Sequence, residues 1–187
     1  MTEKIDIAVA MGDFTAPIAV VYAKEMGLPI GTVCFAWDGN GEIWDLLYHG
    51  QMQTCSAQQP YAIELERLIY QRLGAEEASR YAACCDACQI YAITDEQRVK
   101  LLDGLFCAVV SHKRASSVIR SIYRTNTYVL SPSSALAFAG LQDYRATNNE
   151  TGPALILTEQ GPLAAIETVS NARGISAEDL KLRLRTV

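Results

Sequence analysis

The residues best suited to bind a ligand lie in one short turn near the start of the chain. The turn consists of Gly12, Asp13, Phe14, Thr15 and Ala16. The apolar run Ile5–Met11 predicts a strand before it, and the segment Pro17–Met26 predicts a helix after it. A glycine turn that opens a helix can aim backbone N–H groups at an anion, and the helix dipole favours negative charge there. The spacing is therefore typical of a turn that holds a phosphate group.

The same turn also has a purely structural interpretation. It can be the connection that a βαβ unit requires, with Asp13 or Thr15 capping the helix. Asp13 would place a carboxylate beside a bound dianion, which opposes binding, whereas the Thr15 hydroxyl could donate a hydrogen bond. The sequence leaves both interpretations open.

The cysteines offer a second candidate for chemistry. Cys84, Cys85 and Cys88 form a C-C-x-x-C cluster, but a structural zinc site needs about four ligands, usually in two pairs. The remaining thiols and the two imidazoles are isolated in the sequence: Cys34, Cys55, Cys107, His49 and His112. Cys84 and Cys88 would share one face of a helix, where cysteine acts as a small apolar residue. We therefore expect free, packed thiols, no metal site and no catalytic residue.

The elements that must position these residues alternate along the chain. Apolar runs predict further strands at Ile30–Trp37, Cys107–Ser111 and Pro153–Leu157, and a short extended segment at Tyr128–Leu130. Periodicity and capping residues predict helices at Glu42–Tyr48, Tyr61–Leu73, Ala75–Tyr91, Thr94–Leu105, Ala115–Arg124, Ser131–Leu141 and Leu180–Leu184, and a weak helix after Pro162. Gln51–Gln59 lacks periodicity and is predicted to be a loop. Buried strands separated by helices indicate one α/β domain over residues 1–187, with a mostly parallel sheet.

The bulk composition excludes several classes of protein. Of the 187 residues, 20% are charged and the net charge is −5, which argues against a nucleic-acid partner. No apolar run is long enough to span a membrane, and the first residues do not have the pattern of a signal peptide. We therefore expect a cytoplasmic protein in a reducing compartment, without membrane or nucleic-acid partners.

The order of the motifs resembles threonine synthase, a family of fold-type II pyridoxal phosphate (PLP) enzymes. In that family a Ser-Gly-Asn-Phe-Gly-Asn loop precedes a helix that ends in Lys-Met-Gly-Leu-Pro, and here Met11–Ala16 is followed by Ala23–Pro29. Later segments are similar in order and spacing: Val33–Leu47, Gln53–Ser56, Ile63–Ile69, Ser131–Ala135 and Ala154–Pro162. The resemblance implies a three-layer, Rossmann-like domain that corresponds to the later part of the large domain of the family.

The resemblance also implies where a cofactor would bind. The Gly12–Ala16 turn would hold the PLP phosphate, although Asp13 stands where the family has Asn and Thr15 where it has Gly. Thr158 or Glu159 would occupy the place of the residue that contacts the pyridine nitrogen. Ser131, Ser133 and Ser134 replace Asp, His and Thr of another family loop and would cap a helix.

The lysine that binds PLP in the family lies in a Phe-Lys-Asp context, which this chain lacks. The chain contains Lys4, Lys24, Lys100, Lys113 and Lys181, and we expect Lys4 and Lys24 to be solvated charges. The resemblance thus implies a partial domain that is inactive alone and binds no PLP covalently: a pseudoenzyme, a remnant or one half of a split lyase. It would pair as a homodimer or with a separate lysine-bearing chain. The alternative is an independent module on the same scaffold that binds a small anion or a protein.

Overall fold

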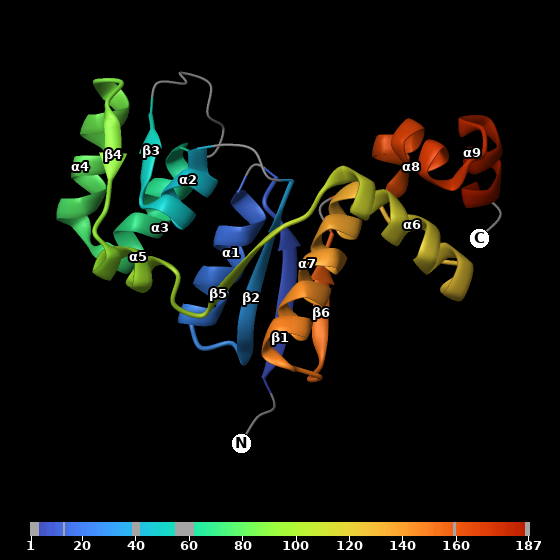
Figure 1. Ribbon diagram of the computed structural model, residues 1–187, viewed down its shortest axis with the longest axis horizontal. Coiled ribbons are helices and arrows are strands. Elements are labelled where there is room, and N and C mark those ends of the chain that lie inside the picture. Colours follow the sequence, from blue (N-terminus) through green and yellow to red (C-terminus); the bar gives the residue numbers. More distant parts are fainter. Residues whose placement is uncertain (1–3, 13, 39–41, 55–61, 159, 186–187) are drawn as a thin grey trace.

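The computed structural model of the chain describes residues 4–12, 14–38, 42–54, 62–158 and 160–185. At its centre lies a four-stranded sheet with the order β5-β2-β1-β6 (Figure 1). Its strands are β1 (Ile5–Ala10), β2 (Ile30–Trp37), β5 (Leu105–Val109) and β6 (Ala154–Leu157). Every strand pairing within this four-stranded sheet is parallel, which confirms the predicted α/β class.

Alternate side chains of the sheet pack against helices on opposite faces. Val9 and Phe35 belong to a core that includes α1 (Thr15–Glu25), whereas Ala8 and Cys34 contact α7 (Pro132–Asn148). This alternation follows from the period of two along a strand. The result is a helix, sheet and helix arrangement, in agreement with the three layers expected from the sequence.

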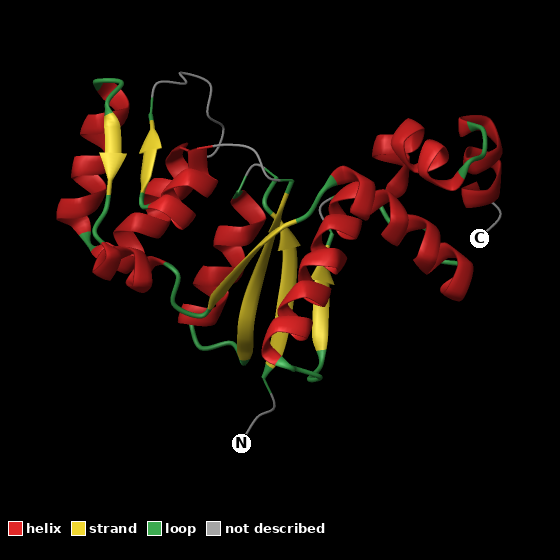
Figure 2. Ribbon diagram, in the orientation of Figure 1, coloured by secondary structure: helices red, strands yellow, loops and turns green. Residues whose placement is uncertain are grey.

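A lobe of short elements follows β2 and lies beside β5 (Figure 2). It contains α2 (Glu42–His49), β3 (Gln51–Gln53), α3 (Ala62–Leu73), α4 (Ala75–Asp86), β4 (Ile90–Ala92) and α5 (Asp95–Leu101). Three predictions are wrong here. The helix predicted over Thr94–Leu105 ends at Leu101, and Leu105 begins β5. The start of the predicted loop is β3, and the predicted helix Ala75–Tyr91 ends at Asp86, because β3 and β4 pair antiparallel and bury Met52 opposite Tyr91. The rest of that loop, Cys55–Gln59, lies outside the described residues.

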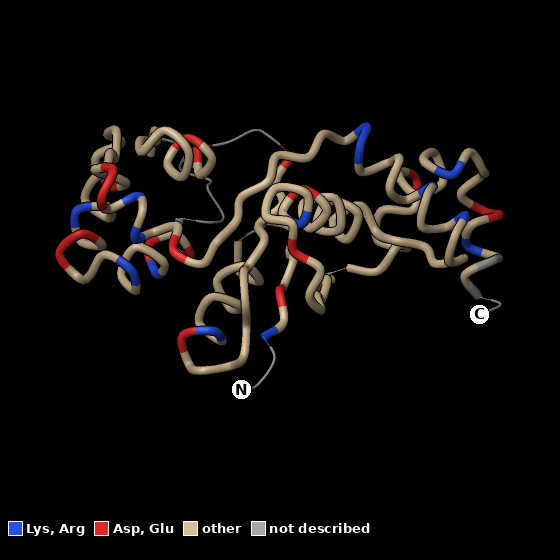
Figure 3. The backbone as a smooth tube through the Cα atoms, turned by 60° about the horizontal axis from the view of Figure 1, so that its bottom comes forward, with Lys and Arg blue, Asp and Glu red and all other residues tan. Residues whose placement is uncertain are grey.

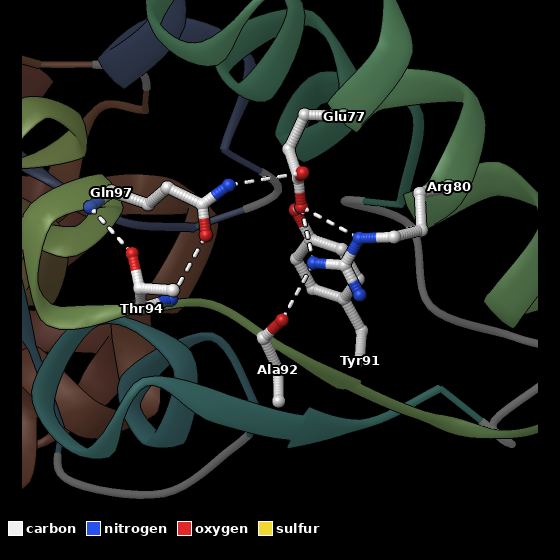
Figure 4. A network of polar contacts seen from close by, with 6 residues as sticks. All are labelled: Glu77, Arg80, Tyr91, Ala92, Thr94 and Gln97. Carbon is white, nitrogen blue, oxygen red and sulfur yellow. Dashed lines mark hydrogen bonds and ion pairs between the residues drawn. The ribbon is translucent and has the colours of Figure 1, made fainter.

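A polar network joins α4, β4 and α5 in this lobe (Figure 4). Glu77 accepts hydrogen bonds from the Tyr91 hydroxyl at 2.7 Å, from Gln97 at 3.0 Å and from Arg80. Gln97 also forms a capping box with Thr94 at the start of α5. Burial raises the pKa of the Glu77 carboxyl, but the hydrogen bonds together lower it by more. The net shift of the Glu77 pKa is therefore downward. The network holds the lobe together and leaves Glu77 bound to structural partners.

A second lobe at the other end of the sheet contains α6 (His112–Asn126), the 3₁₀ turn Pro162–Ala165, α8 (Ile166–Arg173) and α9 (Ala177–Arg185) (Figure 2). Helix α6 packs against both α7 and α8. Ser176 caps α9, since its hydroxyl accepts a hydrogen bond from Asp179 N at 3.0 Å. Tyr128–Leu130 pairs with no strand in the described part of the chain.

The thiols do not all lie where the sequence placed them. Cys34 is fully buried, as expected, whereas Cys84 and Cys107 are only partly shielded. Cys88 lies beyond the end of α4 with a φ of 53°, so it does not share a helical face with Cys84. Among the described residues no group of potential ligands is arranged to hold a metal ion. Within the same residues no helix has the length and apolarity of a membrane span.

Candidate functional site

The turn between β1 and α1 lies at the carboxyl edge of the sheet, where ligands of open α/β folds commonly bind. Gly12 is exposed and has a φ of 30°, and Phe14 has a φ of 71°. The Phe14 side chain is fully buried and its ring meets Phe35 edge-on, with 5.6 Å between the ring centres. Phe14 therefore anchors the turn in the core and presents no side chain to a ligand.

The start of α1 differs from the predicted cap. Phe14 is the N-cap residue and Thr15 is the first helical residue, so the capping role predicted for Thr15 is wrong. The left-handed conformation of Phe14 brings its own N–H to Met11 O at 2.7 Å and thereby closes the turn without a capping side chain at that position. Asp13 lies outside the described residues. Ala16 is half-buried and Thr15 is exposed.

Two backbone positions of this turn cannot donate to a phosphate. The N–H of Phe14 is bound to Met11 O, and Pro17, the third residue of α1, has no N–H. A phosphate cradle depends on several convergent backbone N–H groups at a helix N-terminus. The described turn thus has fewer free N–H groups for an anion than its length suggests.

Thr158 lies at the same edge of the sheet. Leu157 is in register with Val9, so Thr158 follows β6 beside the end of β1. The hydroxyl of Thr158 lies 3.1 Å from that of Ser134, which in turn lies 2.8 Å from that of Ser131. The structure therefore brings Thr158 into a hydroxyl cluster at the start of α7. Glu159 lies outside the described residues.

The cap predicted at the start of α7 is confirmed. Ser131 is the N-cap residue and accepts a hydrogen bond from Ser134 N at 3.2 Å. Ser133 completes the cluster, with its hydroxyl 3.0 Å from that of Ser131. Ser131 and Ser134 are almost completely buried, so these hydroxyls mainly satisfy one another and the helix end.

A cavity of about 480 Å³ opens beside this cluster. It is lined by Ile122, Asn126, Tyr128, Leu130, Phe138, Ile156 and Thr158. Its polar groups are amides and hydroxyls, and no titratable carboxylate, lysine or histidine lines it. This cavity could hold an apolar group, but its lining offers no general base.

Sequence reasoning missed one pair at the carboxyl edge. His112 Nε2 lies 3.6 Å from Asp38 Oδ2, and the imidazole is largely exposed. Asp38 directly follows β2 and His112 begins α6 shortly after β5. The sequence could have predicted this pair, because each residue directly or closely follows a buried strand. Neighbouring parallel strands end at the same edge of a sheet, so residues that follow them lie close together. Its exposure makes the pair a weak electrostatic contact.

The described lysines do not supply a nucleophile at the turn. The prediction that Lys24 is a solvated charge is wrong, because its side chain is half-buried. The Lys24 Nζ donates hydrogen bonds to Gly31 O at 2.5 Å and to Gly104 O at 3.4 Å. Burial and the nearby Arg72 lower the pKa of Lys24. Gly31 and Gly104 lie near the starts of β2 and β5, so Lys24 is at the opposite edge of the sheet from Gly12. The four remaining lysines also lie outside the turn, either before β1 or on other helices: Lys4, Lys100, Lys113 and Lys181.

Comparison with known proteins places this geometry in context. No family model matches the sequence. The structure is similar to that of PLP-bound threonine synthase from Brucella melitensis, with a TM-score of 0.74 and 20% identity over 92% of this chain and 39% of that one. For threonine synthase from yeast the TM-score is 0.74, with 19% identity over 91% of this chain and 38% of that one. For threonine synthase from Escherichia coli the TM-score is 0.63, with 19% identity over 94% of this chain and 37% of that one.

The chain spans less than two fifths of the length of each of these threonine synthases. At this level of identity the likeness concerns the fold, and it runs through nearly all of the present chain. The resemblance seen in the order of the sequence motifs is therefore confirmed in three dimensions: this chain has the fold of part of a threonine synthase.

Proposed function

We propose that this chain is a threonine synthase-like partial domain that has no threonine synthase activity by itself. The observation that carries the proposal is the combination of a threonine synthase-like fold with a turn at Gly12 in which fewer backbone N–H groups are free to bind a phosphate. The Phe14 amide is already bound, Pro17 offers none, and Lys24 lies at the opposite edge of the sheet. A PLP enzyme of this type needs a lysine that forms the internal Schiff base.

The experiment is a titration of the purified chain with PLP, followed by borohydride reduction and mapping of its five lysines by mass spectrometry. We expect no protein-dependent absorbance band and no preferential modification of one lysine. Stoichiometric labelling of a single residue, such as Lys113 at the carboxyl edge, would contradict the proposal. A Lys113→Arg variant separates a specific site from random surface labelling, because only a specific site would be lost in it.

The chain by itself is proposed to form a homodimer through β6. In the described residues β6 has a strand neighbour, β1, on one side only. Leu155 and Leu157 are 58% and 40% exposed, although they project from the same face of the sheet as the buried Val9. Exposed strand edges with apolar side chains favour pairing with another chain. A second copy suits this edge, since two β6 strands related by a twofold axis would pair antiparallel.

Light scattering at tens of micromolar tests this association. We expect a dimer for the natural sequence and a monomer for Leu155→Lys, which places a charge on the proposed interface. Val99→Lys is the matched control, since Val99 is 70% exposed on α5 and is expected to remain dimeric when substituted. A monomeric natural chain would contradict the dimer and favour an independent module, and a complex formed only with a lysine-bearing chain would favour one half of a split enzyme.

A further inference from the structure

A polar cavity lies in the second lobe, away from the turn at Gly12. Its volume is about 670 Å³, and it is bounded by α6 and by the end of α8. It is lined by Ser117, Arg120, Ser121, Tyr123, Arg124, Thr125, Arg173 and Ile175. Three guanidinium groups and several hydroxyls therefore face one space, and no acidic residue lines it.

Arg173 is held in a fixed orientation within this cavity. Its guanidinium carbon lies 3.4 Å from the centre of the Tyr123 ring, which is the stacking geometry that arginine favours. The Nε of Arg173 is buried and has no hydrogen-bond partner. The buried Nε is not accessible to a ligand in this conformation, so Arg173 contributes its positive charge in a defined plane.

The other two arginines lie on the surface of α6 at the same cavity. Arg120 and Arg124 are four residues apart, so they project from the same side of the helix, where like charges repel. Neither they nor Arg173 form an ion pair within the part of the chain that the structure describes. Five other arginines do pair with carboxylates: Arg67, Arg72, Arg80, Arg98 and Arg114. The cavity lining itself contains no aspartate or glutamate.

The surroundings strengthen the positive potential. Helix α6 has four lysine and arginine residues and no aspartate or glutamate, although the whole chain has a net charge of −5 (Figure 3). The negative ends of helix dipoles explain single cations in a last turn, such as Arg124 in α6 and Arg173 in α8. They do not explain Arg120, which lies well before the end of α6, or the shared cavity.

We propose that the cavity formed by Arg120, Arg124 and Arg173 binds the phosphate group of a small phosphorylated molecule. Guanidinium groups bind phosphate oxygens through paired N–H donors, and the Ser121 hydroxyl lines the same space. The cavity volume exceeds what one phosphate group needs, so an organic body can be accommodated beside it. This site is separate from the proposed PLP-free turn and does not depend on the proposed lack of synthase activity.

Calorimetry with inorganic phosphate and with glycerol 3-phosphate, at low ionic strength, tests the proposal. We expect both probes to bind, with glycerol 3-phosphate the tighter, and Arg120→Gln and Arg124→Gln each to weaken binding about tenfold. Lys113→Gln is the matched control, because Lys113 is an exposed cation of the same helix that does not line the cavity. We expect less than a twofold effect from it.

Amide chemical shifts recorded during the same titration locate the bound probe. The proposal predicts shifts around Ser121, Tyr123 and Arg173. It is overturned if neither probe binds at about 10 mM, which corresponds to an interaction too weak for a built site. It is equally overturned if Lys113→Gln weakens binding as much as Arg120→Gln does, or if the shifts concentrate at Thr15 and Ala16. Because Arg120 and Arg124 are exposed, their variants are expected to keep the fold.

Discussion

Gly140 controls how closely α7 approaches the sheet. A Cβ atom at this position would lie 2.9 Å from the Cβ of Ala36 and 3.4 Å from the Cβ of Ala108. These contacts involve short, rigid side chains of β2 and β5, so neither neighbour can rotate away. Gly140→Ala must therefore move α7 relative to the strands.

Two opposing effects set the size of the change. Replacing glycine by alanine inside a helix favours folding by about 1 kcal/mol, whereas overpacking a tight core costs about 1–3 kcal/mol. We therefore expect Gly140→Ala to lower the free energy of unfolding by up to about 2 kcal/mol, although the same substitution in an unobstructed helix would raise it. The sign of the effect thus depends on the contact with Ala36.

Urea unfolding followed by circular dichroism measures this change. Gly161→Ala is the control, because a Cβ at Gly161 would meet no atom within 4 Å and its φ is −72°. Ala36→Gly should partly rescue Gly140→Ala, with a coupling of about 0.5 kcal/mol or more in a double-mutant cycle. An increase in stability of about 1 kcal/mol for Gly140→Ala alone would refute the reasoning, since it would mean that the close contact costs nothing.

Three further predictions concern titratable groups. Burial raises the pKa of Cys34 and of Cys107 to about 12, so at pH 8 a thiol reagent should modify the exposed Cys88 far faster, and equal rates would contradict this. The lowered pKa of Glu77 stabilises the fold above its unfolded value of about 4.3, and this contribution is lost as the pH falls through the lower folded value. Glu77→Gln should therefore flatten the dependence of the urea midpoint on pH below about 5, and an unchanged slope would exclude this role. Lys24→Met removes the donor to two carbonyls at strand starts and should cost about 0.5–1.5 kcal/mol in urea unfolding, whereas no loss would indicate that water replaces the ammonium group.

Local patterns were sufficient to predict most of the elements. The strand Ile30–Trp37 is found with the predicted bounds, because its apolar, β-branched residues are buried on both faces of a parallel sheet. Capping residues gave the starts of helices correctly at Thr94 and Ser131, since a cap depends on atoms within three residues of it. These features are determined by the sequence alone.

Pairing between distant segments required the tertiary structure. Residues 90–92 continue an alanine-rich stretch that favours a helix, yet they form β4 because Tyr91 is buried against Tyr81 and Met52 of the paired strand. The environment of Lys24 also depends on distant segments. Its position on a helix suggested exposure, but its ammonium group donates to carbonyls near the starts of β2 and β5. Such interactions depend on chain segments far apart in sequence, and no local pattern encodes them.

The candidate sites divide in the same way. The glycine turn at Gly12 and the order of motifs were visible in the sequence, because turn chemistry and spacing are local properties. The loss of the Phe14 amide to Met11 O depends on a left-handed residue, and the grouping of Arg120 with Arg173 depends on the packing of α6 against α8. The sequence therefore indicated the fold, whereas the tertiary structure decided which polar groups are available to a ligand, because availability depends on where folding places each donor and acceptor.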